Sequence, residues 1–135
     1  MTALSPRLAA VVEALPLTPS SFVLEVGCGP GAAARAVAAR LVDGRVVAID
    51  RSATAVAAAR RAGADLIAAG RLDVRQVAIE DFVREPDEPP FDLVFAVRVG
   101  ALDGRHPGAA AWARITAALA PDGRVFLDGR PVRHG

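Results

Sequence analysis

Three glycines and a carboxylate lie within seven consecutive positions, from Glu25 to Gly31. Glycine adopts positive φ angles without steric cost, so this spacing suits a tight turn between a strand and a helix. Bare backbone also lets a ligand lie close to the chain, and the first amides of a helix attract polar or anionic groups. Asp50 follows Gly27 by 23 positions, where the end of a neighbouring strand places an acid that can bind both hydroxyls of a ribose. These residues predict a site for a ligand with a ribose and a polar end.

A second group of chemically active residues lies between Arg98 and His106. Arg98 interrupts an apolar stretch where that stretch ends, and its guanidinium could bind a carboxylate or phosphate on an acceptor. The structural alternative is an arginine that extends to solvent and pairs with Glu80, Asp81 or Asp103. His106 could act as a general base, although a histidine in a loop or at a helix start is the simpler explanation. No catalytic residue is assigned beyond these two candidates, and two histidines in the chain do not make a metal site.

The elements that must position these residues follow from the hydrophobic pattern. The strands are continuous apolar runs, which is typical of parallel strands covered on both faces by helices. We therefore expect a doubly wound, Rossmann-like α/β fold with strand order 3-2-1-4-5, right-handed crossovers and a ligand crevice at the carboxyl ends of the strands. The expected strands are 21–26, 45–50, 72–78, 91–97 and 124–128, and the expected helices are 4–15, 32–41, 52–69 and 107–119.

At this level of detail the chain resembles a known family. Residues 23–37 and 46–52 are similar to the first two motifs of the class I S-adenosylmethionine-dependent methyltransferases. Residues 90–97 resemble the fourth-strand segment of that family, and 121–128 resemble its turn into the fifth strand. The resemblance covers about residues 20–130. It implies methyl transfer from S-adenosylmethionine, which leaves S-adenosylhomocysteine, to a small-molecule acceptor.

The resemblance implies a cofactor site built from the ends of the first four strands. The glycine turn would line the methionine end, and Asp50 would hold the ribose hydroxyls, with Arg51 against the adenine face. Glu80 or Asp81 would contact the adenine amino group; the match is ambiguous by one position. Val97, Arg98 and Val99, which follow the fourth strand, would lie beneath the transferred methyl group. The implied cofactor-binding residues are Glu25, Gly27, Cys28, Gly29, Gly31, Asp50, Arg51, Ser52, Ile79, Glu80, Asp81, Phe82, Val97 and Arg98.

A dinucleotide site is the competing interpretation, because Gly27, Gly29 and Ala32 satisfy the pattern G-x-G-x-x-A. Gly31 argues against it, since a third glycine widens the turn for a methionine moiety. Glu25 argues against it too, because its carboxylate would repel a pyrophosphate. The chain also has no room for the substrate domain of a dehydrogenase.

Several of these residues have structural explanations as well. Asp50 could cap the next helix, although Ser52 already suits that position. Glu80 and Asp81 could form a solvated turn. Cys28 is best explained as a small packing residue in a crowded turn, because no histidine or aspartate partner is suggested near it.

Composition limits the remaining classes. The chain has 135 residues, of which 53% are hydrophobic, so we expect one folded domain over 1–135, with an N-terminal helix and linker at 1–19 and a core at 20–130. One cysteine excludes an internal disulfide, and the absence of lysine excludes Schiff-base chemistry. A net charge of +1 and 4% aromatic residues disfavour a nucleic-acid partner. No apolar run is long enough to span a membrane, so we expect a cytoplasmic protein.

The end of the chain departs from the family pattern. After the fifth expected strand, residues 129–135 are too few for the two further strands that the family usually adds, so we expect the sheet to lack them. The fifth strand would then be an edge, covered by a homodimer or partner chain, or guarded by Arg124, Arg130 and Arg133. This departure leaves a second functional alternative: a cofactor-binding module or non-catalytic subunit that needs a partner.

Overall fold

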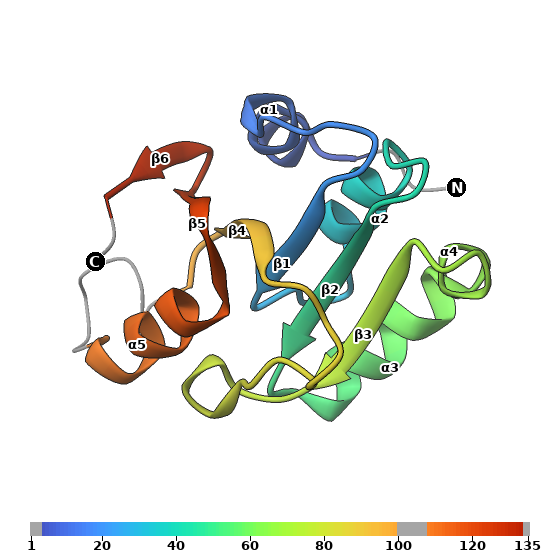
Figure 1. Cartoon of the computed structure of the whole chain (residues 1–135). Helices are drawn as coiled ribbons and strands as arrows, with labels where there is room; N and C mark the ends of the chain where they lie inside the picture. Colours follow the sequence, from blue (N-terminus) through green and yellow to red (C-terminus); the bar gives the residue numbers. More distant parts are fainter. Residues whose placement is uncertain (1–3, 100–107, 134–135) are drawn as a thin grey trace.

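A six-stranded sheet in the order β3-β2-β1-β4-β5-β6 forms the centre of the computed structural model, which describes residues 4–99 and 108–133 (Figure 1). The first five strands are parallel, and β6 runs antiparallel to β5. The expected α/β class and the order 3-2-1-4-5 are therefore confirmed. The strands are β1 (Phe22–Val26), β2 (Arg45–Asp50), β3 (Leu72–Gln76), β4 (Phe91–Ala96), β5 (Leu119–Leu127) and β6 (Arg130–Val132).

The helices begin and end where local signals favour it. The hydroxyls of Ser5 and Ser52 each accept a hydrogen bond from an amide three residues on and so cap α1 and α3. The single helix expected over 52–69 is instead two helices divided at Gly63. A Cβ on Gly63 would lie 2.5 Å from Cδ2 of Leu72, so the helix approaches β3 closely there. The helices are α1 (Pro6–Ala14), α2 (Ala32–Ala38), α3 (Ala53–Ala62), α4 (Ala64–Ala68) and α5 (Ala109–Ala118), with a 3₁₀ turn η1 (Ile79–Asp81).

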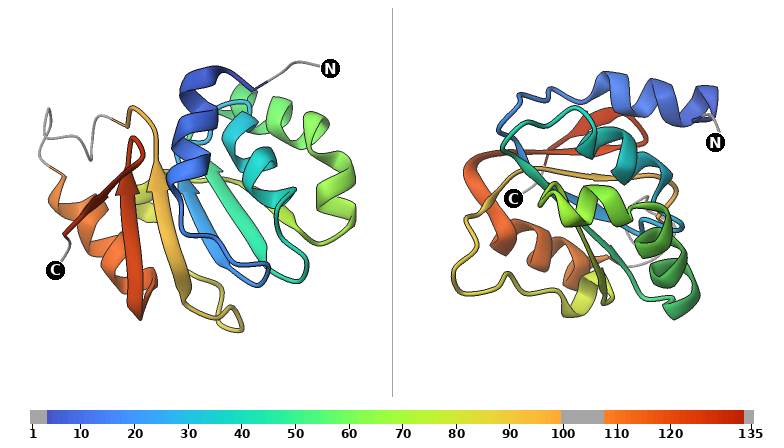
Figure 2. Two further views of the ribbon diagram at one scale, coloured as in Figure 1. Left: turned by 90° about the horizontal axis from the view of Figure 1, so that it is seen from above. Right: turned by 90° about the vertical axis from the view of Figure 1, so that its right-hand side faces the viewer.

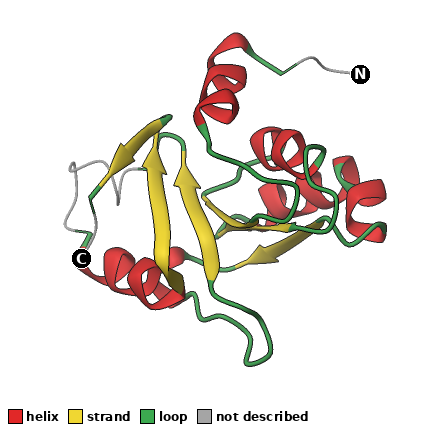
Figure 3. Ribbon diagram, turned by 45° about the horizontal axis from the view of Figure 1, so that its top comes forward, coloured by secondary structure: helices red, strands yellow, loops and turns green. Residues whose placement is uncertain are grey.

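Helices cover both faces of the sheet (Figures 2 and 3). Successive residues of β1 point to opposite faces: Val23 packs with α1, α2 and α3, whereas Leu24 packs with α5 and η1. Both side chains are fully buried. This two-sided burial explains why the strands are apolar throughout rather than alternating. None of the helices in the described ranges is long and apolar enough to cross a bilayer.

The register brings three chain segments together at the carboxyl ends of the parallel strands. Val26 at the end of β1 lies opposite Ile49 of β2 on one side and Ala96 of β4 on the other. Because these strands are parallel, the residues that follow each of them meet at the same place. The glycine turn, the chain after Asp50 and residues 97–99 are therefore neighbours.

The expectation that the tail cannot add a strand is wrong. Arg130–Val132 forms β6, paired with the end of β5. Asp128 and Gly129 connect the two strands with φ angles of +51° and +82°, as a two-residue hairpin turn of type I′ requires. The dipeptide Asp-Gly is itself the sequence signal for this turn. The structure thus has one short antiparallel strand where two were thought absent.

The start of β5 also differs from the expectation. Residues 121–123 were expected to form a turn before the strand, but the strand already begins at Leu119. The pairing with β4 shifts register between Phe91 and Leu93, which face Leu119 and Arg124 respectively. The extra residues are accommodated as an irregularity within one strand, so the proline-containing segment interrupts the ladder without ending it.

Candidate functional site

The glycine turn after β1 is held to the neighbouring strand by its own backbone. The amides of Gly27 and Cys28 both donate to the carbonyl oxygen of Ile49, each at 2.9 Å, and the amide of Gly31 donates to the carbonyl of Cys28 at 3.0 Å. The φ angles of Gly27, Gly29 and Gly31 are +71°, +54° and +87°. All three glycines therefore occupy the left-handed region that disfavours other residues.

The three glycines have different surroundings. A Cβ on Gly27 would lie 2.8 Å from Cγ2 of Val99, and one on Gly31 would lie 3.0 Å from Cβ of Ala59. These two glycines permit close approach of other parts of the chain. Among residues 4–99 and 108–133, nothing lies within 4 Å of the position that a Cβ on Gly29 would take. Gly29 is therefore the glycine with open space over its backbone, which is what a ligand needs.

Asp50 connects the end of β2 to this turn. Its Oδ2 accepts the amide hydrogen of Gly29 at 2.9 Å, and its Oδ1 accepts that of Ser52 at 2.9 Å. The helix cap is made by the Ser52 hydroxyl, which accepts from Ala55, so Asp50 is not the cap of α3. Each carboxylate oxygen can accept a further hydrogen bond. Asp50 thus supports the turn and keeps the capacity to bind hydroxyl groups.

Glu25 is a buried carboxyl group close to the turn, with 3% of its surface exposed. Burial, opposed by a hydrogen bond from the Ala34 backbone and reinforced by the nearby Asp50 carboxylate, raises the pKa of Glu25 from 4.5 to about 8. The Oε1 atom has no hydrogen-bond partner among the described residues. A buried acceptor without a donor is costly, and a ligand that brings a hydrogen-bond donor would satisfy it.

Cys28 is buried within the same turn. Burial is the main cause that raises the pKa of its thiol to about 12, and the neighbouring acidic groups Glu25 and Asp50 act in the same direction. A thiol this weakly acidic is protonated at neutral pH and is a poor nucleophile. The structure supports the interpretation of Cys28 as a packing residue.

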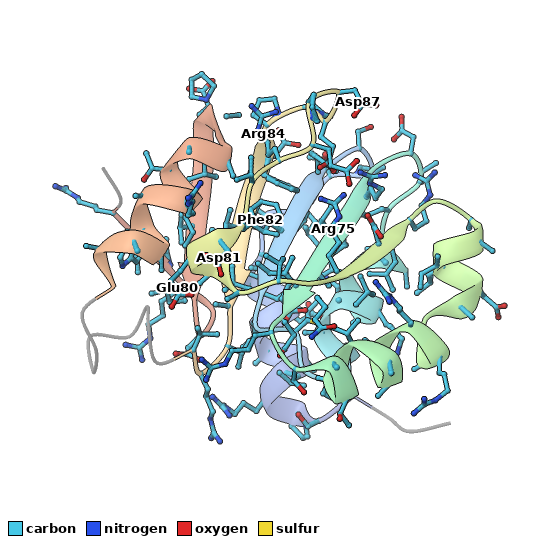
Figure 4. The ribbon with its side chains drawn as sticks, turned by 90° about the horizontal axis from the view of Figure 1, so that it is seen from below. Arg75, Glu80, Asp81, Phe82, Arg84 and Asp87 are labelled. Atoms are coloured by element: carbon cyan, nitrogen blue, oxygen red, sulfur yellow. The ribbon has the colours of Figure 1, made fainter. Side chains whose placement is uncertain are left out.

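The residues after β3 separate into two groups (Figure 4). Ile79 and Phe82 are buried in the core, and the ring of Phe82 lies 6.1 Å from that of Phe91, at the start of β4. Phe82 is therefore turned toward the amino end of the sheet rather than toward the glycine turn. Glu80 and Asp81 are exposed, and the carbonyl of Glu80 accepts a hydrogen bond from Arg114 on α5 at 3.1 Å.

Two residues that the sequence analysis missed lie nearer to Asp50. The amide of Val77 donates to the Asp50 carbonyl at 3.0 Å, and Nε2 of Gln76 donates to the carbonyl of Arg51 at 3.4 Å. They directly follow or end β3, so the strand boundary is the signal that could have found them. Arg51 itself is exposed beside them.

The segment after β4 is the third part of the candidate site at the carboxyl ends of the strands. Val97 and Val99 are half-buried, and Arg98 between them is exposed with a φ of +55°. The Arg98 amide donates to Oδ1 of Asp128 at 2.9 Å. Within residues 4–99 and 108–133 no ion pair joins Arg98 to Glu80 or Asp81. The candidate base His106, like Asp103, lies outside the described residues.

The remaining chemistry of the described residues lies outside the candidate site. A pocket of about 180 Å³ lies between residues 82–86 and α5, where Arg84 and Arg114 border it, and no residue of the glycine turn lines it. Among the described residues there is no group of histidine, cysteine, aspartate and glutamate side chains that could hold a metal ion.

Comparison with known proteins agrees with this geometry. The model of the family described as methyltransferase domain matches residues 23–123. A trans-aconitate 2-methyltransferase of Paracidovorax citrulli is 36% identical over 113 residues, which are 84% of this chain and 40% of that protein. The chain thus spans less than half the length of this curated relative.

Solved structures show the same fold. The S-adenosylmethionine-dependent methyltransferase from Geobacter sulfurreducens, solved with S-adenosyl-L-homocysteine, superposes with a TM-score of 0.71 at 22% identity and covers 92% of this chain and 48% of that one. The [4+2]-cyclase SpnF superposes with a TM-score of 0.72 at 26% identity, covering 89% of this chain and 42% of that one. The fold alone therefore accommodates more than one reaction. The family model, however, spans the glycine turn, Asp50 and all strands up to β5, so the chain belongs to the methyltransferase-domain family.

Proposed function

We propose that this chain binds S-adenosylmethionine at the carboxyl edge of β1, β2 and β4 and transfers its methyl group to a small-molecule acceptor. One observation carries the proposal: the open backbone of Gly29 is held by Asp50 directly beside Glu25, a buried carboxyl group with an unpartnered oxygen. This arrangement offers a bare surface, a hydroxyl acceptor and a buried acceptor within one turn. Those are the features that an amino-acid nucleoside needs.

The residues present fit the two ends of this cofactor. Glu25 would accept a hydrogen bond from the ammonium group of the methionine end, and a cation beside it would favour its ionised form. Asp50 would accept the ribose hydroxyls with its remaining lone pairs. Gln76 and Val77 border the position of the base next to Arg51. Phe82 lies in the core, so we no longer assign it an adenine contact.

When bound, the cofactor supplies a methyl group on a sulfonium centre, whose leaving group is already activated. The chain therefore has to position two reactants in line rather than activate the leaving group. A general base is needed only when the acceptor must lose a proton during attack. His106 is the candidate for that step, and the segment Val97–Val99 forms the wall beneath the reacting carbon.

A carboxylate is the class of acceptor that we propose. The curated relative is named for trans-aconitate, which is a carboxylate, and Arg98 exposes a guanidinium at the end of β4. Guanidinium groups bind carboxylates through two parallel hydrogen bonds. We expect trans-aconitate and other small carboxylates to be better acceptors than neutral phenols or amines of similar size.

Calorimetry and turnover together test the proposal. S-adenosylhomocysteine should bind the purified chain at one site, whereas NAD should not bind. Methyl transfer to the carboxylate panel, followed by mass spectrometry, should give a product heavier by one methylene unit. Binding without turnover on any acceptor would identify a cofactor-binding module that needs a partner, and absence of binding would refute the cofactor assignment.

A further inference from the structure

We propose that Asp128 is a positioning residue that fixes the wall of the cofactor site formed by residues 97–99. The inference rests on the proposed function, because residues 97–99 form a wall only if the cofactor binds beside the glycine turn. Asp128 lies at the end of β5, and it acts on the end of the neighbouring strand β4.

Asp128 binds the chain on both sides of Val97. Its amide donates to the carbonyl of Ala96 at 2.9 Å, and its Oδ1 accepts the amide hydrogen of Arg98 at 2.9 Å. The first bond continues the ladder between β4 and β5. The second replaces the next ladder bond with a side chain, because β5 has already turned into the hairpin.

The bond to Arg98 stabilises an unfavourable backbone conformation. Arg98 has a φ of +55°, and the left-handed region costs a residue with a Cβ about 1–2 kcal/mol. A hydrogen bond to a carboxylate stabilises by a comparable amount. Without this acceptor, no hydrogen bond to the Arg98 amide would offset the cost of its positive φ, so the chain after β4 would adopt another path.

The path after β4 determines where Val99 lies. Cγ2 of Val99 approaches to 2.8 Å of the position that a Cβ on Gly27 would occupy. Gly27 is held by the hydrogen bond from its amide to the carbonyl of Ile49. A change of conformation at Arg98 therefore moves Val99 relative to a fixed glycine turn. The distance between these two segments sets the width of the site.

The hairpin that carries Asp128 is itself anchored to α1. A Cβ on Gly129 would lie 3.5 Å from Cα of Val11 on α1, and Nη2 of Arg7 lies 3.6 Å from Oδ1 of Asp128. Both side chains of this ion pair are 45% exposed, so the pair contributes little. Arg7→Ala is therefore a matched control that removes the ion pair and leaves the bond to the Arg98 amide.

The main variant is Asp128→Gly, which removes the carboxylate but tolerates the positive φ of the turn. We expect its affinity for S-adenosylhomocysteine to fall roughly fivefold to tenfold, which is the loss of one such hydrogen bond. Asp128→Asn keeps an acceptor oxygen and should stay within about twofold of the wild type, as should Arg7→Ala. In an Arg98→Gly background, where the positive φ costs nothing, Asp128→Gly should have no further effect.

A second measurement requires no ligand. In the apo chain, amide hydrogen exchange at Arg98 should accelerate in Asp128→Gly and not in Asp128→Asn, and the amide resonances of Gly27 and Val99 should shift only in the former. Equal exchange rates and affinities in Asp128→Gly and the wild type would overturn the inference. So would an equal loss in the Arg98→Gly background. If the wild type fails to bind the ligand while the exchange pattern holds, the proposed function fails and the positioning of the wall by Asp128 stands.

Discussion

At the scale of single residues, the carboxyl groups of Glu25 on β1 and Asp50 on the adjacent strand β2 lie in different environments. Asp50 is ordered by two backbone amides at the rim of the site, whereas Glu25 lies in the interior with an unpartnered oxygen. Their environments separate their roles: one is prepared to accept hydroxyl groups, and the other is held neutral until a cationic donor arrives. This difference arises from burial, because the side chains carry the same functional group.

The first prediction concerns Asp50. Asp50→Ala should weaken S-adenosylhomocysteine binding by about 1–3 kcal/mol, since hydrogen bonds to a charged acceptor are lost. Calorimetry measures the change, with Asp43→Ala as the control, because Asp43 is an exposed acid bonded to Ser20 before β2 begins. An Asp50→Ala affinity equal to that of the control would contradict the ribose assignment.

The second prediction concerns the pH dependence that Glu25 imposes. Its pKa is about 8 in the folded chain and 4.5 ordinarily, so between these values the unfolded chain has lost a proton that the folded chain keeps. Stability should therefore fall as the pH rises through this window, by up to about 1.4 kcal/mol per pH unit, and level off above it. Urea denaturation from pH 5 to pH 9 should show this slope in the wild type.

The variant Glu25→Gln provides the comparison. It cannot ionise, so its stability should lack this part of the pH dependence and exceed that of the wild type above pH 8, while its affinity for the cofactor falls. The same slope in both proteins would show that Glu25 is not the group that titrates.

At the scale of elements, the chain between η1 and β4 acts as a strap, which we define as residues 83–90. Glu88 anchors it: its carboxylate is bound by both terminal nitrogens of Arg75 on β3, at 2.9 and 2.8 Å, and by Arg45 on β2 at 2.7 Å. Figure 4 shows Arg75 on β3, with Arg84 and Asp87 on the strap. Burial raises the pKa of Glu88, but the bonds from Arg75 and the Glu85 amide outweigh this effect and leave it lowered.

The third prediction follows from this anchor. Glu88→Gln should lower the free energy of unfolding by about 2–4 kcal/mol, because it removes the buried charge that pairs with Arg75 and leaves that guanidinium paired with the more exposed carboxylate of Asp73. Glu85→Ala is the control, because Glu85 is 61% exposed and its carboxylate lies as far as 4.0 Å from Arg75. This substitution should change the free energy of unfolding by less than about 0.5 kcal/mol. Because the pKa of Glu88 is lowered, its contribution should be present at neutral pH and be lost on acidification. Thermal or urea unfolding at pH 7 and pH 4 distinguishes the two variants.

At the scale of the whole molecule, β6 changes the edge of the sheet. The sequence predicts that β5 is an edge, either covered by a homodimer or partner chain or guarded by arginines; in the structure, β6 occupies the end of this edge. Leu127 and Arg130 pair across the two-residue turn, so Pro131 directs its nitrogen outward, where it has no hydrogen to donate. A short edge with a proline and an arginine resists pairing with another chain, which favours the guarded edge over the dimer.

The fourth prediction tests this edge. The chain should sediment as a monomer, and Pro131→Val should increase association with concentration, because it restores an outward donor on the edge strand. Arg61→Ala, on the exposed side of α3 and away from β5 and β6, serves as the control for a simple change of surface charge. A wild-type dimer at micromolar concentration would show that another surface of the molecule is the interface.

The strand order, the glycine turn and the place of Asp50 could all be predicted from the sequence, because apolar runs, glycines and caps act over a few residues. The burial of Phe82 beside Phe91 could not be predicted in the same way, because a local motif does not reveal toward which end of the sheet a ring turns. The bonds of Asp128 to Arg98 and of Glu88 to Arg45 join residues 30 and 43 positions apart. Such contacts leave no periodic trace, since they depend on which strand ends and loops the packed sheet brings together. Local chemistry therefore determined the elements and the cofactor turn, and only the tertiary structure decided how the wall, the strap and the edge are held.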